Sequence, residues 1–232
     1  MIHFIKLKIM KYITLAFLCI SSLLHAQSPI EKTIGEFNEL KVFDLIEVKL
    51  VKSNQNKIEI TGKNANDVVI VNRNGLLKIR MKLEESFDGN RTHVTLYYTN
   101  LDTIDVNEGT YVFSDEPLKQ FDLKLKAQEG GSIKLNVETS YLDVKSVTGG
   151  NIETKGTVKK QKVTLNTGGV YQGEDLKTEE TEVSIVAAGE AYVNASKLVD
   201  VKIRVGGDVY IYGDPEKVNE SKAIGGRIKR MD

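Results

Sequence analysis

The chain has 232 residues, and its 32 basic and 32 acidic side chains give a formal net charge of zero at pH 7. A near-neutral charge of mixed sign, with no basic block, argues against nucleic acid and anionic membrane surfaces as partners. The only cysteine is Cys19, so an internal disulfide and a cluster of thiolate metal ligands are both excluded. The length suits one domain with one sizeable core.

The first 26 residues have the character of a secretory signal peptide. Three positive side chains open the segment, namely Lys6, Lys8 and Lys11. An apolar run over residues 12–24 follows, and the small residue Ala26 offers a cleavage site. The run is short for a membrane span, which disfavours the alternative of an N-terminal anchor. The residues before Cys19 do not resemble a lipoprotein cleavage site, so we predict cleavage after Ala26 without lipidation.

Cleavage after Ala26 defines the remaining organisation. Residues 27–33 then form a leader and residues 34–232 a single domain, less regular over 34–118 and with regular coils over 119–232. No second apolar stretch follows, so we expect no transmembrane segment in the mature chain. We predict an exported protein in the periplasm, on the outer-membrane surface or outside the cell.

Residues 34–118 predict irregular β-structure that contains a hairpin. The dipeptide Asn74-Gly75 separates two apolar segments, 69–71 and 77–81, and is a strong signal for a two-residue hairpin turn. No segment beyond the N-terminus has a helical period, and the chain has only three prolines. The sequence therefore predicts an all-β protein.

From residue 119 onward, a glycine recurs at intervals of 18 to 20 residues, and five of the six stand second in a Gly-Gly pair. These repeat glycines are Gly131, Gly150, Gly169, Gly189, Gly207 and Gly226. Fixed self-similarity near this period is the sequence signature of a solenoid. The segment 106–111 resembles a first, imperfect copy of the same unit.

Aligned on the repeat glycine, the copies show the period of two that a half-buried strand requires. Branched aliphatic side chains stand six residues before the glycine: Leu125, Val144, Val163, Val183 and Val201. Seven residues before it, at an outward position, stand Lys124, Asp143, Lys162, Glu182, Asp200 and Asn219. If the coils stack in register, this outward column places opposite charges on several neighbouring rungs.

We therefore predict an all-β fold of stacked β-coils, like a β-helix or solenoid, with about six coils of roughly 19 residues. Each coil runs as a strand, turns at the glycine pair and continues as a second strand. Glycine suits the turn because it reaches positive φ without a Cβ clash. The last coil carries positive charges that would blunt an open sheet edge, Lys222, Arg227, Lys229 and Arg230. A β-sandwich is the alternative, but its turns are usually about 8–12 residues apart.

The sequence offers little for catalysis or metal binding. After the signal peptide there is one histidine, His93, which any Ser-His-acid triad would have to use. A zinc site built on several histidines cannot form. The glycine pairs also lack the Gly-Gly-x-Gly-x-Asp pattern of calcium-binding repeats. We predict no catalytic residue, no metal and no cofactor.

A polysaccharide-cleaving enzyme is an alternative, because such enzymes need only carboxylates in a groove. The candidate carboxylates are Asp143, Glu174, Asp175, Asp200 and Asp208. Their spacing forms no distinctive cluster. The hypothesis requires two carboxylates that face each other about 5–9 Å apart in a cleft.

Two tyrosines provide a binding hypothesis. Tyr192 and Tyr210 both stand three residues after a repeat glycine, at an outward position on adjacent coils. Two exposed rings one rung apart would form a platform for a sugar or a partner protein. The alternative, which we favour, is an aromatic ladder that only stabilises the coils. Tyr171 has an even offset and is expected to point inward.

Several segments together resemble a known family. They are Phe37–Val42 (FNELKV), Asn74–Ile79 (NGLLKI), the Gly-Gly-x-Ile/Val of the coils and Tyr212–Pro215 (YGDP). Over roughly residues 34–230 the chain resembles the auto-transporter adhesins with a head GIN domain, a domain of unknown function common in exported proteins of Bacteroidetes. This resemblance implies right-handed stacked β-coils. The tripeptide Asp102-Thr103-Ile104 also resembles an O-glycosylation site of exported Bacteroidetes proteins, which implies a sugar on Thr103.

The expected function is that of an exported, non-catalytic, adhesin-like module of the cell envelope or surface that recognises a glycan or a protein. One alternative is a structural or assembly protein of the envelope without a small ligand, and another is the polysaccharide-processing enzyme. A concave, aromatic-lined face would favour the first hypothesis. A flat apolar patch would favour the second, and opposed carboxylates the third.

Overall fold

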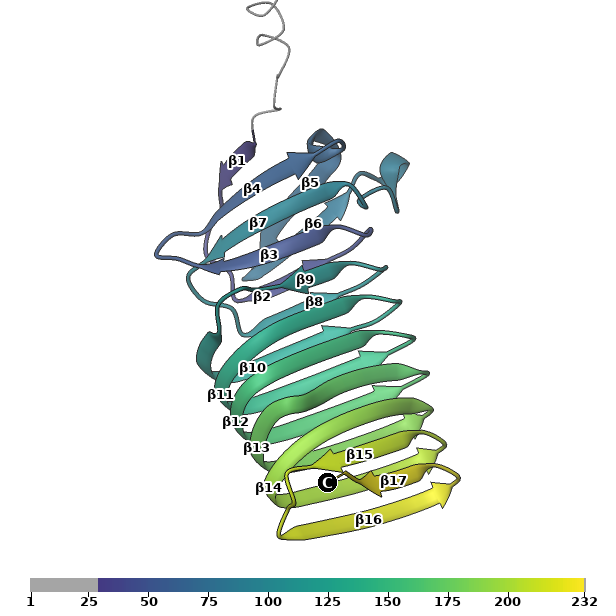
Figure 1. Cartoon of the computed structure of the whole chain (residues 1–232). Helices are drawn as coiled ribbons and strands as arrows, with labels where there is room; N and C mark the ends of the chain where they lie inside the picture. Colours follow the sequence, from purple (N-terminus) through teal and green to yellow (C-terminus); the bar gives the residue numbers. More distant parts are fainter. Residues whose placement is uncertain (1–28, 232) are drawn as a thin grey trace, which may run out of the picture.

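The computed structural model of the chain describes residues 29–231, so the signal peptide predicted over 1–26 lies outside the described residues. Within this part of the chain, 17 strands belong to one continuous sheet (Figure 1). They are β1 (Ile30–Thr33), β2 (Glu39–Val42), β3 (Glu47–Lys52), β4 (Lys57–Gly62), β5 (Val68–Arg73), β6 (Leu76–Met81), β7 (Thr92–Tyr98), β8 (Thr103–Val106), β9 (Tyr111–Phe113), β10 (Leu118–Ala127), β11 (Ser132–Val147), β12 (Asn151–Asn166), β13 (Gly169–Ala187), β14 (Gly189–Val205), β15 (Asp208–Tyr212), β16 (Lys217–Ile224) and β17 (Arg227–Arg230). Two short 3-10 helices occur, η2 (Ala65–Asp67) and η3 (Leu83–Glu85). Between residues 29 and 231, no helix has the length and apolar character that crossing a membrane requires.

The strands from β8 to β17 form a column of about seven stacked coils (Figure 1). The strand before each turn pairs in parallel with its counterpart in the next coil, and so does the strand after the turn. Strands β11 to β14 bend midway, so each supplies the second strand of one coil and the first strand of the next. Tight turns line one edge of the column and these bends line the other, and we call them the turn edge and the bend edge. The predicted stack of β-coils is confirmed, and the imperfect unit at 106–111 is its first coil.

The register also follows the sequence columns. The outward column pairs in the predicted order Lys124, Asp143, Lys162, Glu182, Asp200 and Asn219. The aliphatic column six residues before the repeat glycine is at most 1% exposed. Tyr171 is fully buried, as expected. Each coil therefore presents one row of side chains to the core and the next row to solvent.

The N-terminal part covers the first coil as a cap. Strands β2 and β3 form a coil-like unit that pairs in parallel with β8 and β9. Strands β6 and β7 then stack in parallel on the far side of this unit, although they follow it in the chain. The Asn74-Gly75 hairpin joins β5 and β6, and β1, β4 and β7 pair antiparallel. This mixture of pairings explains the irregular sequence pattern of the cap.

In the pairs that end at Gly131, Gly150 and Gly169, the two glycines serve different purposes. In the turn after β10, Glu129 and Gly130 have φ of 54° and 76°, the double positive φ of a type I′ turn. The next glycine, Gly131, has no positive φ, and neither has Gly150. A Cβ added to Gly150 would lie 2.3 Å from the carbonyl oxygen of Ala127 in the preceding coil. At Gly131 and Gly150 the expected conformational reason therefore applies to the preceding glycine, and close packing between coils explains Gly150 itself. At Gly189, Gly207 and Gly226 the repeat glycine does have positive φ, of 144°, 105° and 87°, as expected.

The last coil ends the core with polar side chains. Glu220 pairs with Val201 and Lys222 with Ile203, so two charged residues occupy positions that are apolar in earlier coils. Both are exposed because no further coil covers them. On the other strand of this coil, Arg227 forms an ion pair with Asp208 of the neighbouring rung. Charge on inward and outward positions alike protects this open edge from pairing with another molecule.

Candidate binding groove

A groove of about 720 Å³ runs across the coils on the strands that precede the turns. We call it the charged groove. It lies between two outward columns that flank a buried column. One wall is Thr103, Lys124, Asp143, Lys162, Glu182 and Asp200, and the other is Asp122, Tyr141, Lys160, Glu180 and Leu198. The groove is thus an outcome of the repeat, since each coil adds one residue to each wall.

Ion pairs between neighbouring rungs order most charges of this groove. Lys160 Nζ lies 2.9 Å from Glu180 Oε2, and this contact raises the pKa of Lys160. Lys202 Nζ lies 3.3 Å from Asp200 Oδ1 and 3.7 Å from Glu182 Oε1. Asp200 is the main cause that raises the pKa of Lys202. Lys162 is exposed and forms no ion pair with any residue between 29 and 231.

An exposed aromatic pair lies at the end of the groove nearer the cap. The rings of Phe121 and Tyr141 meet edge to face, with centroids 5.4 Å apart and planes at 64°. Phe121 is 66% exposed and Tyr141 is 45% exposed, and Tyr141 lines the groove. Exposed rings beside polar groups are common in sites for sugars and partner proteins. The sequence held a signal for Tyr141, which stands at an odd, outward offset nine residues before Gly150, but not for Phe121, whose offset of ten residues before Gly131 is even.

The predicted tyrosine pair lies on the other face of the column, on the strands that follow the turns. The rings of Tyr192 and Tyr210 are stacked, with centroids 4.6 Å apart and planes at 7°. Lys229 Nζ lies 5.5 Å from the centroid of Tyr210, and the Tyr192 hydroxyl donates a hydrogen bond to Glu190 Oε2 at 3.2 Å. Stacking along the column covers ring faces and leaves ring edges toward solvent. This geometry favours the aromatic-ladder interpretation over a flat platform, and a ligand at these tyrosines stays a prediction.

The other predicted residues are spread over the molecule. Thr103 is partly exposed in β8 and lies at the end of the charged groove, while His93 is on β7 with its Nδ1 3.0 Å from Glu47 Oε1. Of the candidate carboxylates, Asp143 and Asp200 line the groove, whereas Asp208 lies on the opposite face. Across residues 29–231, no three His, Cys, Asp or Glu side chains converge as metal ligands.

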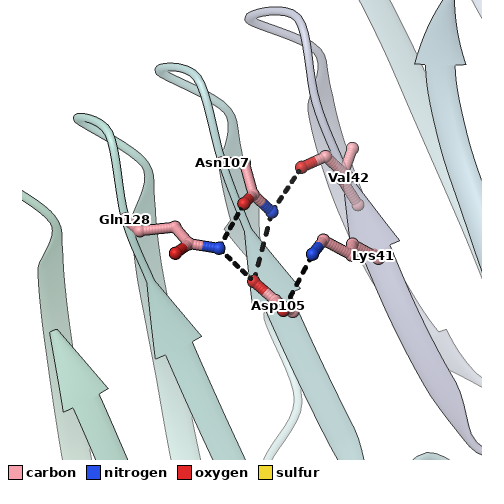
Figure 2. Close-up of polar contacts among 5 residues, drawn as sticks. All are labelled: Lys41, Val42, Asp105, Asn107 and Gln128. Carbon is pink, nitrogen blue, oxygen red and sulfur yellow. Dashed lines mark hydrogen bonds and ion pairs between the residues drawn. The ribbon is translucent and has the colours of Figure 1, made fainter. Parts of the chain in front are cut away.

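A buried carboxylate joins the first coil to the cap (Figure 2). Asp105 is 5% exposed, and its Oδ1 accepts hydrogen bonds from Asn107 Nδ2 at 3.1 Å and Gln128 Nε2 at 3.4 Å. Its Oδ2 lies 3.5 Å from Lys41 Nζ, and Asn107 also donates to the Val42 carbonyl. Each carboxylate oxygen thus has a partner from a neighbouring rung. The cluster has a structural role that sequence reasoning did not find, because Asp105 occupies an outward position.

A second buried polar network lies inside the coils around Tyr171. Its hydroxyl contacts Thr154 Oγ1 at 2.6 Å and accepts a hydrogen bond from Gln161 Nε2. Burial raises the pKa of Tyr171. Thr181 then bonds Gln161 Oε1 at 3.3 Å, so the network crosses several coils. Gln161 and Thr181 also line the charged groove, and the polar groups of both are hydrogen-bonded within the network.

The geometry defines a class of protein, a β-solenoid of stacked coils with a strand-rich cap and a long groove across the coils. The sequence shows which family within this class. The chain belongs to the family described as "Putative auto-transporter adhesin, head GIN domain", which matches residues 36–215. This confirms the resemblance stated from the sequence.

Solved structures share the same fold. A "putative adhesin" from Bacteroides fragilis has a TM-score of 0.81 at 18% identity, over 88% of this chain and 96% of that one. A "putative adhesin" from Parabacteroides distasonis has a TM-score of 0.71 at 17% identity, over 89% and 98%. A "putative lipid binding protein" from the same organism has a TM-score of 0.66 at 17% identity, again over 89% and 98%. These proteins are described as adhesins or binding proteins and not as enzymes. No curated protein sequence matches the chain.

Proposed function

We propose that this protein is an exported, non-catalytic, adhesin-like binding module of the cell envelope, which holds an extended glycan or protein segment in its charged groove. The observation that carries the proposal is the groove itself. It crosses successive coils, carries both signs of charge and has the exposed Tyr141 ring at one end. Clefts with aromatic side chains and a few placed polar groups are the usual form of a ligand site.

The length of the groove suits an extended ligand. Neighbouring rungs of a sheet lie about 4.8 Å apart, so the six residues from Thr103 to Asp200 offer a regular row of contacts. An extended chain that runs along the column would meet a new pair of wall residues at each rung. Lys162 is the wall cation without an ion-pair partner among the described residues, so it is available to a ligand anion.

The same groove supports binding better than hydrolysis. A glycosidase needs one carboxyl group as an acid and a second as base or nucleophile. Here Glu180 lies beside Lys160, while Glu182 and Asp200 share Lys202. The contacts of Lys160 with Glu180 and of Lys202 with Glu182 join neighbouring rungs, and the contact of Lys202 with Asp200 lies within β14, as expected for structural ion pairs.

An envelope assembly protein without a small ligand is the second candidate. Val205 and Ile224 pair on adjacent rungs at the turn edge and are 49% and 66% exposed. Two side chains form a small apolar area for a protein interface. The charged last coil beside them disfavours pairing through the sheet edge. The groove therefore ranks first.

Binding of the purified protein, expressed from the full-length chain, to an array of bacterial glycans tests the proposal. The Tyr141→Ala/Lys162→Ala variant alters the charged groove, and the Tyr192→Ala/Tyr210→Ala variant alters the stacked tyrosines on the other face. Loss of binding in the first variant alone supports the groove. Loss in the second alone contradicts the groove and moves the site to the tyrosines. If no glycan binds, crosslinking in cells with a photoreactive group at position 141 tests for a protein in the groove.

A further inference from the structure

A second groove, of about 830 Å³, lies on the bend edge of the column. We call it the bend groove. Its floor is a column of three residues that pair in register, Thr139, Val158 and Thr178. Its walls and ends are Gln120, Glu138, Ser140, Thr157, Lys159, Lys177, Glu179, Asn194, Ser196 and Gly213. The bend groove shares no lining residue with the charged groove.

The floor holds a hydroxyl group without a partner. Thr139 is 9% exposed, and its Oγ1 makes no hydrogen bond. The equivalent hydroxyl of Thr178, two rungs further on, contacts Thr181 Oγ1 and donates to the Asn194 carbonyl, both at 2.8 Å. Thr139 Oγ1 is also closed off from solvent, so the floor offers no hydroxyl that a ligand can reach, and the exposed hydroxyls of Thr157 and Ser196 on the walls are the accessible ones. A hydroxyl can both donate and accept, which suits it to a polyhydroxylated ligand.

The walls combine neutral polar groups with two unpaired cations. Glu138 forms an ion pair with Lys119 at 2.9 Å, and Glu179 forms one with Lys197 at 2.6 Å, so both wall carboxylates are neutralised by lysines. Lys159 and Lys177, by contrast, form no ion pair within residues 29–231 and are exposed. The remaining charge of the groove is therefore positive.

The composition of the lining narrows the class of ligand. The residues that line the groove include no aromatic side chain and a single aliphatic one, Val158. Protein interfaces depend on buried aromatic and apolar anchors, which this lining lacks. Nucleic acids require many cations to match the phosphate backbone, and two lysines do not supply them. Hydroxyl and amide groups with two isolated cations match a glycan that carries carboxylate groups.

We propose that the bend groove is a second binding site, which takes an acidic polysaccharide that contains uronic acids. Its carboxylates pair with Lys159 and Lys177, and its hydroxyls bond Thr157 and Ser196. The chain lies along the column, because the groove crosses the rungs from β10 to β14. This site acts independently of the charged groove, so either proposal can hold without the other.

Titration calorimetry with polygalacturonate oligomers tests the inference, with neutral dextran and dextran sulfate of matched length as comparison ligands. The protein purified from the full-length chain should bind polygalacturonate and not dextran. The Lys159→Gln/Lys177→Gln variant should bind it at least tenfold more weakly, and Thr157→Val several-fold more weakly. Lys145→Gln removes an exposed lysine that lines neither groove, and it should leave this affinity unchanged. Circular dichroism melting curves establish that each variant is folded.

Three results overturn the inference. One is the absence of polygalacturonate binding by the unaltered protein. Another is an equal affinity for dextran sulfate, which would show that negative charge alone accounts for the binding. The third is an unchanged affinity in Thr157→Val, which would show that the hydroxyls of the groove wall take no part. None of these results bears on glycan binding that is lost in the Tyr141→Ala/Lys162→Ala variant, so failure here is distinguishable from failure of the proposed function.

Discussion

Gly150 lies so close to Ala127 of the preceding coil that a Cβ added to Gly150 would be 2.3 Å from the Ala127 carbonyl oxygen. Backbone atoms cannot move away without separating two paired strands. We therefore predict that Gly150→Ala lowers the free energy of unfolding by about 2–3 kcal/mol, the usual cost of overpacking. Urea unfolding followed by circular dichroism measures this change.

The neighbouring glycine provides the matched control. Gly149 has φ of 71°, and a Cβ added there would meet nothing within 4 Å. Gly149→Ala should therefore cost only the strain of a left-handed alanine, about 1–2 kcal/mol. Equal losses for the two variants would contradict the packing argument and attribute both glycines to backbone conformation.

The residue before this glycine carries strain that can be removed. Thr148 has φ of 49°, a left-handed conformation that a β-branched residue rarely adopts. At the cap hairpin the same turn is built from Asn74 and Gly75, with φ of 52° and 80°. We expect Thr148→Asn to raise the free energy of unfolding by about 1 kcal/mol, because asparagine tolerates left-handed backbone. The shift in melting temperature checks this.

Thr164 offers the comparison for this substitution. It lies within β12 at a partly exposed position, with no positive φ. There the change to asparagine should lower the melting temperature slightly, because threonine is favoured in strands. A rise at both positions would show that the gain at Thr148 does not come from the turn.

The repeat allowed the column of coils to be predicted from the sequence, but it did not allow the grooves to be predicted. The pairing of Lys124 with Asp143 and of Val144 with Val163 follows from one alignment on glycine, since equal spacing forces equal register. The two columns that form the walls of the charged groove follow from the same alignment, but the alignment does not show that the surface between them is hollow. The paired Phe121 and Tyr141 rings lie 20 residues apart in the chain, so offset alone did not bring them together.

The cap was less predictable for a different reason. Its hairpin followed from Asn74-Gly75, because a turn is a local feature. The order of its strands did not follow, because β2 and β3 stack between β6–β7 and β8–β9, against the order of the chain. Pairing between strands distant in the chain is set by packing of the whole cap.

The charged side chains of β16, at the open end of the core, suggest how the molecule avoids self-association. Glu220 and Lys222 occupy the inward positions of the last coil, next to Val201 and Ile203. We predict that Glu220→Val/Lys222→Ile extends the apolar core to the open end and causes dimers or aggregates, because an apolar sheet edge is a template for pairing. Size-exclusion chromatography with light scattering measures the change in mass.

Outward positions of the same strand supply the control. Asn219→Val/Ser221→Ile adds similar apolar side chains on the solvent side of β16, where Asn219 pairs with Asp200 and Ser221 with Lys202. This variant should associate less than the inward one. If both associate to the same degree, added hydrophobicity and not the core position is responsible.

Buried tyrosine hydroxyls predict the response to alkaline pH. Burial raises the pKa of Tyr98 to about 12, whereas an unfolded tyrosine ionises near pH 10. A folded-state pKa above the unfolded value means that the folded form retains its proton longer. The stabilisation is therefore constant below about pH 10 and falls as the pH rises from 10 to 12. Burial also raises the pKa of Tyr171, so ionisation of Tyr171 adds to the loss of stability at high pH.

Urea unfolding at pH 8, 10 and 11.5 measures this loss of stability. In Tyr98→Phe, the fall of the urea midpoint between pH 10 and 11.5 should be smaller than in the unaltered protein, because one titrating group is gone. In Tyr171→Phe, the fall should also be smaller, but stability at pH 8 should drop by about 1–3 kcal/mol, because Gln161 and Thr154 lose a buried partner. An unchanged pH dependence in both variants would assign the alkaline response to the lysines of the ion pairs instead.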